Sequence, residues 1–251
     1  MRFYWQKWGT PVRYAILSDI HGNYDAFEAV LEGLSRESID SIICLGDIVG
    51  YGPEPAACLN RVRNTAEYVV AGNHDLAVAE KLNIDGFNLL AREATLWTRD
   101  ELSTENIEYL ASLPLVYHLE GVDIVHGTLC SPELFDYVQT TYDASLSMAH
   151  MQAPVCFIGH SHVPIVFVKD EVICYSLDSE VQIQDDLRVI VNVGSVGQPR
   201  DRDPRASCAV YDTDTKVMQL KRYRYDIDAV VAKVKRAGLP VALGERLRVG
   251  R

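Results

Sequence analysis

The first third of the chain alternates apolar runs with amphipathic segments. The run at 12–19 is rich in strand-forming residues and ends in Ser-Asp, and the runs at 41–47 and 67–75 repeat this pattern. Between them, apolar residues at helical spacing predict a helix over 24–34, and two prolines open a second helix over about 53–62, since proline is tolerated in a first turn. Strand, helix, strand, helix, strand predicts parallel pairing with right-handed crossovers.

The rest of the chain changes from helices to short strands. Two helices are predicted within 87–112, where the apolar period is near 3.6 and Ser103 is a candidate N-cap of the second. Further strands are expected at about 115–119, 122–126, 155–159, 164–169, 172–177, 189–193, 207–213 and 216–222. A closing helix is expected at 225–235, and the last ten residues give no clear pattern.

No internal repeat, low-complexity tract or Pro/Gly-rich linker divides the chain. We therefore expect a single domain over 11–251, with a helical cap at about 83–113 and an N-terminal extension at 1–10. Sheets packed face to face with helices outside suit this mixture of elements, which indicates an α/β fold.

The charge balance of the chain limits the classes of binding partner that are expected. The 251 residues include 35 acidic and 24 basic ones, a formal net charge of −11, and only a short mixed basic run at 221–224. Extended nucleic-acid binding is disfavoured, whereas a small anionic substrate is compatible because local charge governs its capture.

Neither a membrane-spanning run nor a signal peptide is predicted. Six cysteines without a CxxC pair suggest reduced thiols and a cytoplasmic location. The sequence does not indicate an oligomeric state.

Polar clusters follow the predicted strands at five places. They are Asp19-Ile20-His21-Gly22-Asn23, Gly46-Asp47, Gly72-Asn73-His74-Asp75, His126-Gly127 and Gly159-His160-Ser161-His162. Parallel strands present their carboxyl ends at one edge, where α/β folds bind ligands, so the first three clusters are expected to converge. Carboxylate and imidazole ligands together suit Mn, Fe, Zn or Ni better than Ca or Mg. The pattern therefore predicts a transition-metal site.

Each cluster has a simpler reading when taken alone. Asp47 is a common turn residue, Asn73 is a possible helix cap, and Asn23 is placed to cap the helix that begins at 24. Five of the seven histidines nevertheless fall in these clusters. His118 and His150 have no polar partners in sequence, so structural or surface roles are expected for them.

The order D-x-H, GD, GNH-[D/E], HG, GH-x-H resembles the calcineurin-like metallophosphoesterase superfamily. The segments SDIHGN, GDIVGYGPEP, AGNHD, VHG, GHSHVP and NVGSVGQPRD resemble its small prokaryotic phosphodiesterase-type branch. The resemblance runs from about Ile16 to Arg202 and implies a four-layer α/β/β/α sandwich of two mixed sheets with outer helices. It also implies that Asp19, His21 and His162 hold one metal ion, that Asn73, His126 and His160 hold the other, and that Asp47 bridges them.

The resemblance assigns roles to four further residues. His74 is implied to act catalytically at the scissile phosphate, and Asp75, where many members carry glutamate, is expected to orient His74. Asn23 is implied to contact a phosphate group of the substrate; the alternative is that its side chain only caps the helix that begins at 24. Arg200 lies in the glycine-rich loop NVGSVGQPR, and its guanidinium group is a candidate to bind phosphate oxygens through two hydrogen bonds. The alternative is that Arg200 is exposed to solvent and binds no substrate.

The expected function is that of a metal-dependent phosphoesterase. A metal-bound hydroxide would attack a phosphodiester, a phosphomonoester or a nucleotide phosphoanhydride, with the phosphodiester favoured. Two divalent ions bring +4 and two aspartates bring −2, so the site would attract a small phosphorylated or nucleotide substrate. The alternative is an inactive scaffold or interaction protein on the same fold. Such a protein should have lost metal ligands, and all seven are present.

Overall fold

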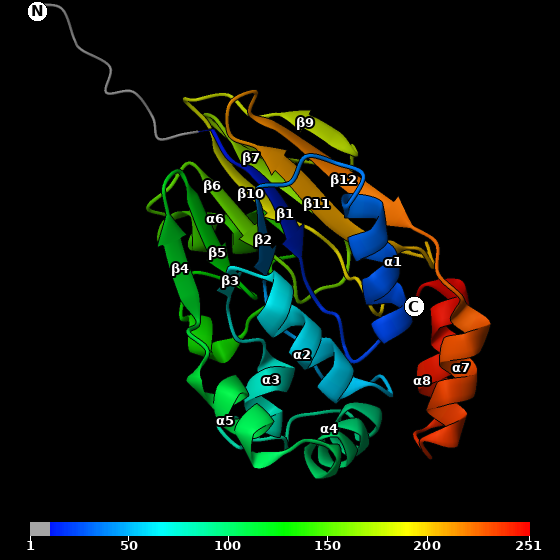
Figure 1. Ribbon diagram of the computed structural model, residues 1–251. Helices are drawn as coiled ribbons and strands as arrows, with labels where there is room; N and C mark the ends of the chain where they lie inside the picture. The colour runs from blue at the N-terminus through cyan, green and yellow to red at the C-terminus, as the bar shows by residue number, and fades with distance from the viewer. Residues whose placement is uncertain (1–10) are drawn as a thin grey trace, which may run out of the picture.

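The computed structural model describes residues 11–251, so the predicted extension at 1–10 lies outside the described residues. Two six-stranded mixed sheets form its centre (Figure 1). The first sheet has the order β3 (Tyr68–Val69), β2 (Ser41–Cys44), β1 (Arg13–Leu17), β11 (Ala206–Asp212), β12 (Val217–Tyr223) and β9 (Glu180–Gln182). The second has the order β4 (Val116–Leu119), β5 (Val122–Val125), β6 (Val155–Ile158), β10 (Arg188–Asn192), β7 (Ile165–Lys169) and β8 (Ile173–Ser176).

Three apolar layers hold the sandwich together. Between the sheets, side chains such as Ile16 and Ile43 from the first sheet pack against Ile124 and Phe157 from the second. Helices α1 (Tyr24–Leu34) and α2 (Pro55–Thr65) bury their apolar faces on the outside of the first sheet. Helix α6 (Thr141–Met148) packs on the outside of the second sheet. The predicted four-layer α/β/β/α sandwich is therefore confirmed.

Local capping signals account for several helix starts. The Asn23 side chain accepts a hydrogen bond from Ala26 N and caps α1, and Pro55 opens α2. The two helices expected within 87–112 are α4 (Leu89–Glu101) and α5 (Thr104–Ser112), the second capped by Ser103 as predicted.

Three segments differ from the sequence-based expectation. The strand expected at 67–75 ends at Val69, and a short helix, α3 (Asn73–Val78), begins inside the polar cluster. Its first turn is closed by Asp75, which accepts a hydrogen bond from Gly72 N. Helix α6 was not expected, because its apolar spacing is weak: Tyr142 and Leu146 are exposed on it. Strand β9 was also missed.

The C-terminal residues are ordered against the body of the protein. Helix α7 (Ile227–Arg236) is the predicted closing helix, and α8 (Val241–Glu245) and the 3₁₀ helix η2 (Arg246–Val249) follow it. Leu243 and Leu247 share an apolar cluster with Tyr51 and with Ala94 of α4. Helices α3, α4, α5, α7 and α8 thus gather at one end of the sandwich (Figure 1). No helix within residues 11–251 is long and apolar enough to cross a membrane.

Candidate metal centre

Six parallel strands direct the site loops to one end of the molecule. Strands β1, β2 and β3 are parallel to one another in the first sheet, as are β5, β6 and β10 in the second. The predicted ligands follow the carboxyl ends of five of these strands, and the loop that carries Arg200 follows β10. The two sheets face each other, so the loops of both sheets meet.

The meeting of these loops produces two buried groups of ligating side chains. They are Asp19, His21, Asp47 and His162 in one group, and Asp47, His126 and His160 in the other. Within each group the ligating atoms lie within 4.8 Å of one another. Six of the seven ligands predicted from the sequence are therefore together, with Asp47 in both groups. His118 and His150 belong to neither.

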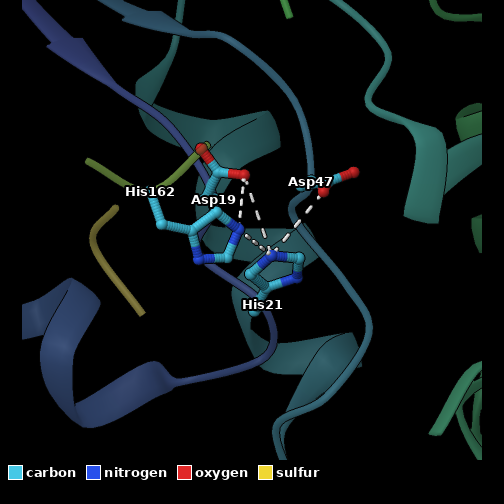
Figure 2. Close-up of side chains that lie close together, drawn as sticks. All are labelled: Asp19, His21, Asp47 and His162. Atoms are coloured by element: carbon cyan, nitrogen blue, oxygen red, sulfur yellow. Dashed lines mark hydrogen bonds and ion pairs between the residues drawn. The ribbon is translucent and has the colours of Figure 1, made fainter. Parts of the chain in front are cut away.

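The side chains of the first group lie close together and face one another, as Figure 2 shows. Asp19 Oδ1 lies 3.1 Å from His162 Nε2 and 3.7 Å from His21 Nε2. The opposite oxygen of Asp19 accepts a hydrogen bond from His160 N at 3.0 Å. One carboxylate oxygen is thus held by the backbone while the other faces the centre.

Asp47 has the same arrangement and faces both groups. Its Oδ1 accepts a hydrogen bond from His74 N at 2.8 Å. Its Oδ2 lies 3.6 Å from His21 Nε2 and 3.3 Å from His126 Nε2. An oxygen between ligands of two groups is the position that a bridging carboxylate requires.

Two oxygens of the predicted ligands are buried with no hydrogen-bond donor within the described residues. They are Asp19 Oδ1 and Asn73 Oδ1. Leaving a buried acceptor unsatisfied costs about 1–3 kcal/mol, so such atoms need an explanation. Asn73 is the first residue of α3 and directly precedes His74. A cation would satisfy both oxygens.

The histidine rings give the clearest evidence that a cation fits. His21 Nδ1 lies 3.0 Å from Val49 O, and His162 Nδ1 lies 2.6 Å from Gln198 O. A carbonyl oxygen only accepts, so both Nδ1 atoms carry the proton and both neutral rings present a lone pair at Nε2. These two Nε2 atoms face each other at 3.1 Å. Two nitrogens bound to one ion at about 2.0–2.1 Å are about 3 Å apart, so a metal ion resolves the repulsion.

The protonation states of His21, His160 and Asp47 match those of metal ligands. Burial lowers the pKa of His21 far below its usual value, and burial together with the charge of His126 lowers the pKa of His160 to about 3. Burial alone would raise the pKa of Asp47, but the neighbouring histidines, His126 first, hold it well below its usual range. Neutral imidazole and ionised carboxylate are the forms that bind metal.

The pKa of His126 differs from those of the other histidines in the two groups. Burial would lower its pKa, but the carboxylates of Asp47 and Asp19 raise the pKa to about 9. A proton on His126 then partly offsets the two negative charges, which is the electrostatic role that a cation fills. His126 Nδ1 is anchored 2.7 Å from Leu45 O.

Five predicted ligands have left-handed backbone conformations. They are Asp19, His21, Asp47, His160 and His162, with φ between 50° and 66°. Non-glycine residues rarely adopt this region, and such strain concentrates at functional sites. The sharp turn after each strand is what aims the ligand into the centre.

The predicted contact between Asp75 and His74 is wrong. The Asp75 carboxylate accepts hydrogen bonds from the backbone N–H groups of Ile48, Val49 and Gly72. His74 Nδ1 is buried with no hydrogen-bond partner in the described part of the chain. The reason is that α3 starts at Asn73, so Asp75 points under the loop after β2 rather than toward His74. Asp75 therefore positions the loop that carries Asp47.

Asp75→Asn is accordingly expected to destabilise the fold by about 1–3 kcal/mol, because an amide nitrogen would face one of the three N–H donors. We expect a lower melting temperature with the metal-binding stoichiometry preserved, measured by thermal denaturation and metal analysis. Asp85→Asn, at an exposed position, is the control. Unchanged stability would contradict this role of Asp75.

Asn23 and Arg200 also lie near the centre. Besides capping α1, Asn23 donates from Nδ2 to Gly197 O at 2.8 Å, so its side chain joins the loop after β1 to the glycine-rich loop. Arg200 is half-buried, and its Nη2 donates to Gln198 Oε1 at 2.7 Å. Contacts of Asn23 and Arg200 with phosphate stay predictions.

Two aromatic residues of the site were missed in the sequence. The Tyr51 ring lies 4.7 Å from the His21 ring and 4.5 Å from the His74 ring. The Tyr137 ring stacks on His160 at 4.1 Å. Tyr51 lies in the GDIVGYGPEP segment, so its closeness to Asp47 was a usable signal. Nothing local distinguishes Tyr137.

The fold and the two buried groups of ligating side chains are those of a metallophosphoesterase, and comparison with known proteins agrees. The calcineurin-like phosphoesterase superfamily domain matches residues 12–216. The chain belongs to this superfamily.

The relatives extend over most of the chain. The uncharacterized protein MJ0912 of Methanocaldococcus jannaschii is 35% identical over 241 residues, which cover 94% of this chain and 98% of that protein. Phosphodiesterase YfcE of Escherichia coli is 24% identical over 204 residues, which cover 78% of this chain and 85% of YfcE. The crystal structure of a metallophosphoesterase from Sphaerobacter thermophilus superimposes with a TM-score of 0.86 at 38% identity, covering 96% of this chain and 100% of that one.

Proposed function

We propose that the protein is an active, dinuclear metal-dependent phosphoesterase that favours phosphodiesters over phosphomonoesters. The observation that carries the proposal is the pair of Nε2 lone pairs of His21 and His162, which face each other at 3.1 Å inside a buried group with Asp19 and Asp47. In an inactive scaffold without metal, nothing would offset the repulsion between these two lone pairs. The name of the E. coli relative supports the preference for diesters.

The residues around the centre would each have a defined task. Asp19, His21 and His162 would hold one ion, Asn73, His126 and His160 the other, and Asp47 both. When bound, two divalent ions polarise the phosphoryl group and make water a nucleophile near neutral pH. Mn, Fe, Zn and Ni are all compatible with these ligands.

His74 is suited to the leaving group. His74 is buried but belongs to neither group of ligating side chains. Its ring lies among the rings of His21, Tyr51 and Phe87. Burial lowers the pKa of His74 to about 4, so the free site holds it neutral, and a bound phosphate anion favours its protonated form. As the oxygen of water bonds to phosphorus, the bond from phosphorus to the leaving oxygen breaks. The leaving oxygen then takes a proton from His74, and a proton of the attacking water restores it.

His74→Ala is the sharpest test of this assignment. We expect hydrolysis of bis(p-nitrophenyl) phosphate by the metal-reconstituted protein to fall about 10²–10⁴-fold, the usual contribution of a positioned acid. Metal content should stay near two ions per chain, measured by plasma mass spectrometry. His150→Ala, at an exposed histidine, is the control.

Two results would change the proposal. Loss of metal from the His74 variant would make this residue a ligand. A wild-type protein that is loaded with metal but inert towards both chromogenic mono- and diesters would favour the scaffold alternative.

A further inference from the structure

The segment between β5 and α6 is anchored against the group of ligating side chains that contains His126. The buried Phe135 ring lies 6.0 Å from the His126 ring. A Cβ added to Gly127, the residue after His126, would lie 3.0 Å from the carbonyl oxygen of Asp136. Val138 is also buried, in the apolar cluster that α6 forms with the second sheet. The residues on both sides of position 137 are therefore held against the body of the protein.

The Tyr137 ring stacks on a predicted metal ligand of that group. Its centroid lies 4.1 Å from the centroid of the His160 ring, and the two rings are 15° from parallel. His160 Nδ1 lies 3.1 Å from His126 Nε2, so the His160 ring is held inside the group. His160 is buried, whereas Tyr137 is 48% exposed. Because His160 covers one face of the Tyr137 ring, the exposed surface lies on the opposite face and the edge of the ring.

Tyr137 differs in its exposure from two other aromatic residues of the site. Tyr51 and Phe135 also contact site histidines, but both are buried. An aromatic side chain left half in water lacks much of the free energy that its burial would supply. A flat ring stacked on the open face of Tyr137 would supply it, since aromatic rings pack favourably face to face with an offset.

His74 and Tyr137 lie beside different groups of ligating side chains. The ring of His74, the candidate proton donor, lies 4.9 Å from the ring of His21 in the first group. Tyr137 contacts His160, which belongs to the second group. A leaving group belongs next to His74, because a proton donor must be within hydrogen-bond reach of the oxygen that it protonates. Tyr137 is placed instead for a substituent that stays on phosphorus.

We propose that the open face of the Tyr137 ring binds the retained ester group of a phosphodiester, and that this group carries a flat aromatic ring such as an aryl group or a nucleobase. The inference rests on the proposed function and deepens it, because it names the substrate class. A monoester has no retained ester group, so it would gain nothing from Tyr137. The stacking therefore agrees with a preference for diesters.

Equilibrium binding of two non-hydrolysable probes tests the role of Tyr137. Isothermal titration of the metal-loaded full chain with phenylphosphonate and methylphosphonate gives a ratio of two dissociation constants. We expect the wild type to bind phenylphosphonate more tightly. Tyr137→Leu, which keeps an apolar side chain but removes the flat face, should reduce this preference about five-fold or more, the loss expected for one stacked ring.

Two further variants serve as controls. Tyr137→Phe should keep the preference, because phenylalanine presents the same flat face. Tyr142→Leu is the matched control, since Tyr142 is an exposed tyrosine of α6; it should leave the ratio unchanged. Equal weakening of both probes by Tyr137→Leu, or loss of bound metal from this variant, would overturn the proposal, because Tyr137 would then only support His160. A wild type that binds both probes equally would overturn it whether or not the leucine variant folds.

Hydrolysis of two matched diesters is a separate measurement. Methyl p-nitrophenyl phosphate and phenyl p-nitrophenyl phosphate share a leaving group and differ only in the retained group. We expect wild-type kcat/KM to favour the phenyl diester, and Tyr137→Leu to reduce this preference about five-fold; an equal fall for both diesters would count against the proposal. Absence of hydrolysis of both by the wild type would defeat the proposed function, while the ratio of dissociation constants would still decide whether Tyr137 binds an aromatic ring.

Discussion

Asp47→Asn is expected to lower phosphodiesterase turnover by about 10³-fold or more and to reduce the bound metal from two ions per chain to about one. Loss of a residue that only supports a ligand typically costs 10–100-fold. Asp47 Oδ2 faces ligands of both groups, so the substitution removes one negative charge from both ions at once.

The Asp47→Asn variant tests the effect of the charge alone, because an asparagine side chain has nearly the same shape as an aspartate side chain. Its side-chain oxygen can still accept the hydrogen bond from His74 N, so the start of α3 should be kept. Metal analysis, turnover of a chromogenic diester and a melting curve measure the three consequences, with Asp85→Asn as control. A variant with two ions and wild-type turnover would show that Asp47 does not bridge.

Gly159→Ala is expected to disable the site through backbone crowding alone. A Cβ at this position would clash with Ser18 Oγ and lie 2.6 Å from Asp19 Oδ2. The same oxygen accepts the hydrogen bond from His160 N that joins the first sheet to the second. The methyl group should therefore separate Asp19 from the loop that carries His160 and His162.

We expect Gly159→Ala to lose about 1–3 kcal/mol of stability, as overpacked substitutions do, and to bind fewer than two ions. A shift in melting temperature of about 2–4 °C per kcal/mol should make the change measurable. Gly86→Ala is the matched control, because an added Cβ there meets no atom within 4 Å. Equal melting temperatures and metal content for the two variants would contradict the crowding at Gly159.

The centre also explains how an acidic protein would bind an anionic substrate. The chain carries a net charge of −11, but only Asp19 and Asp47 contribute negative charge to the two ligand groups. With two divalent ions the groups would have a local charge of about +2, and Arg200, which lies over the Tyr51 ring, would extend the positive region. Local charge, rather than the total, governs capture at such a site.

The pattern of residues determined much of this picture without coordinates. Apolar runs that end in Asp19, Asp47 and the cluster around Asn73 predicted parallel strands with ligands at one edge, since strand direction follows from the intervening helices. The residue types predicted a transition-metal site. The N-caps Asn23 and Ser103 were also readable, because a cap depends only on contacts within one helical turn.

Only the tertiary structure decided how side chains from distant segments meet. It places Asp75 on the backbone of the loop after β2 instead of on His74, turns the Nε2 atoms of His21 and His162 toward each other, and joins Gly250 near the C-terminus to Arg202. His21 and His162 are 141 residues apart in the chain. Periodicity and capping act over a few residues, whereas these contacts depend on how two sheets and the C-terminal helices pack, which no local pattern encodes.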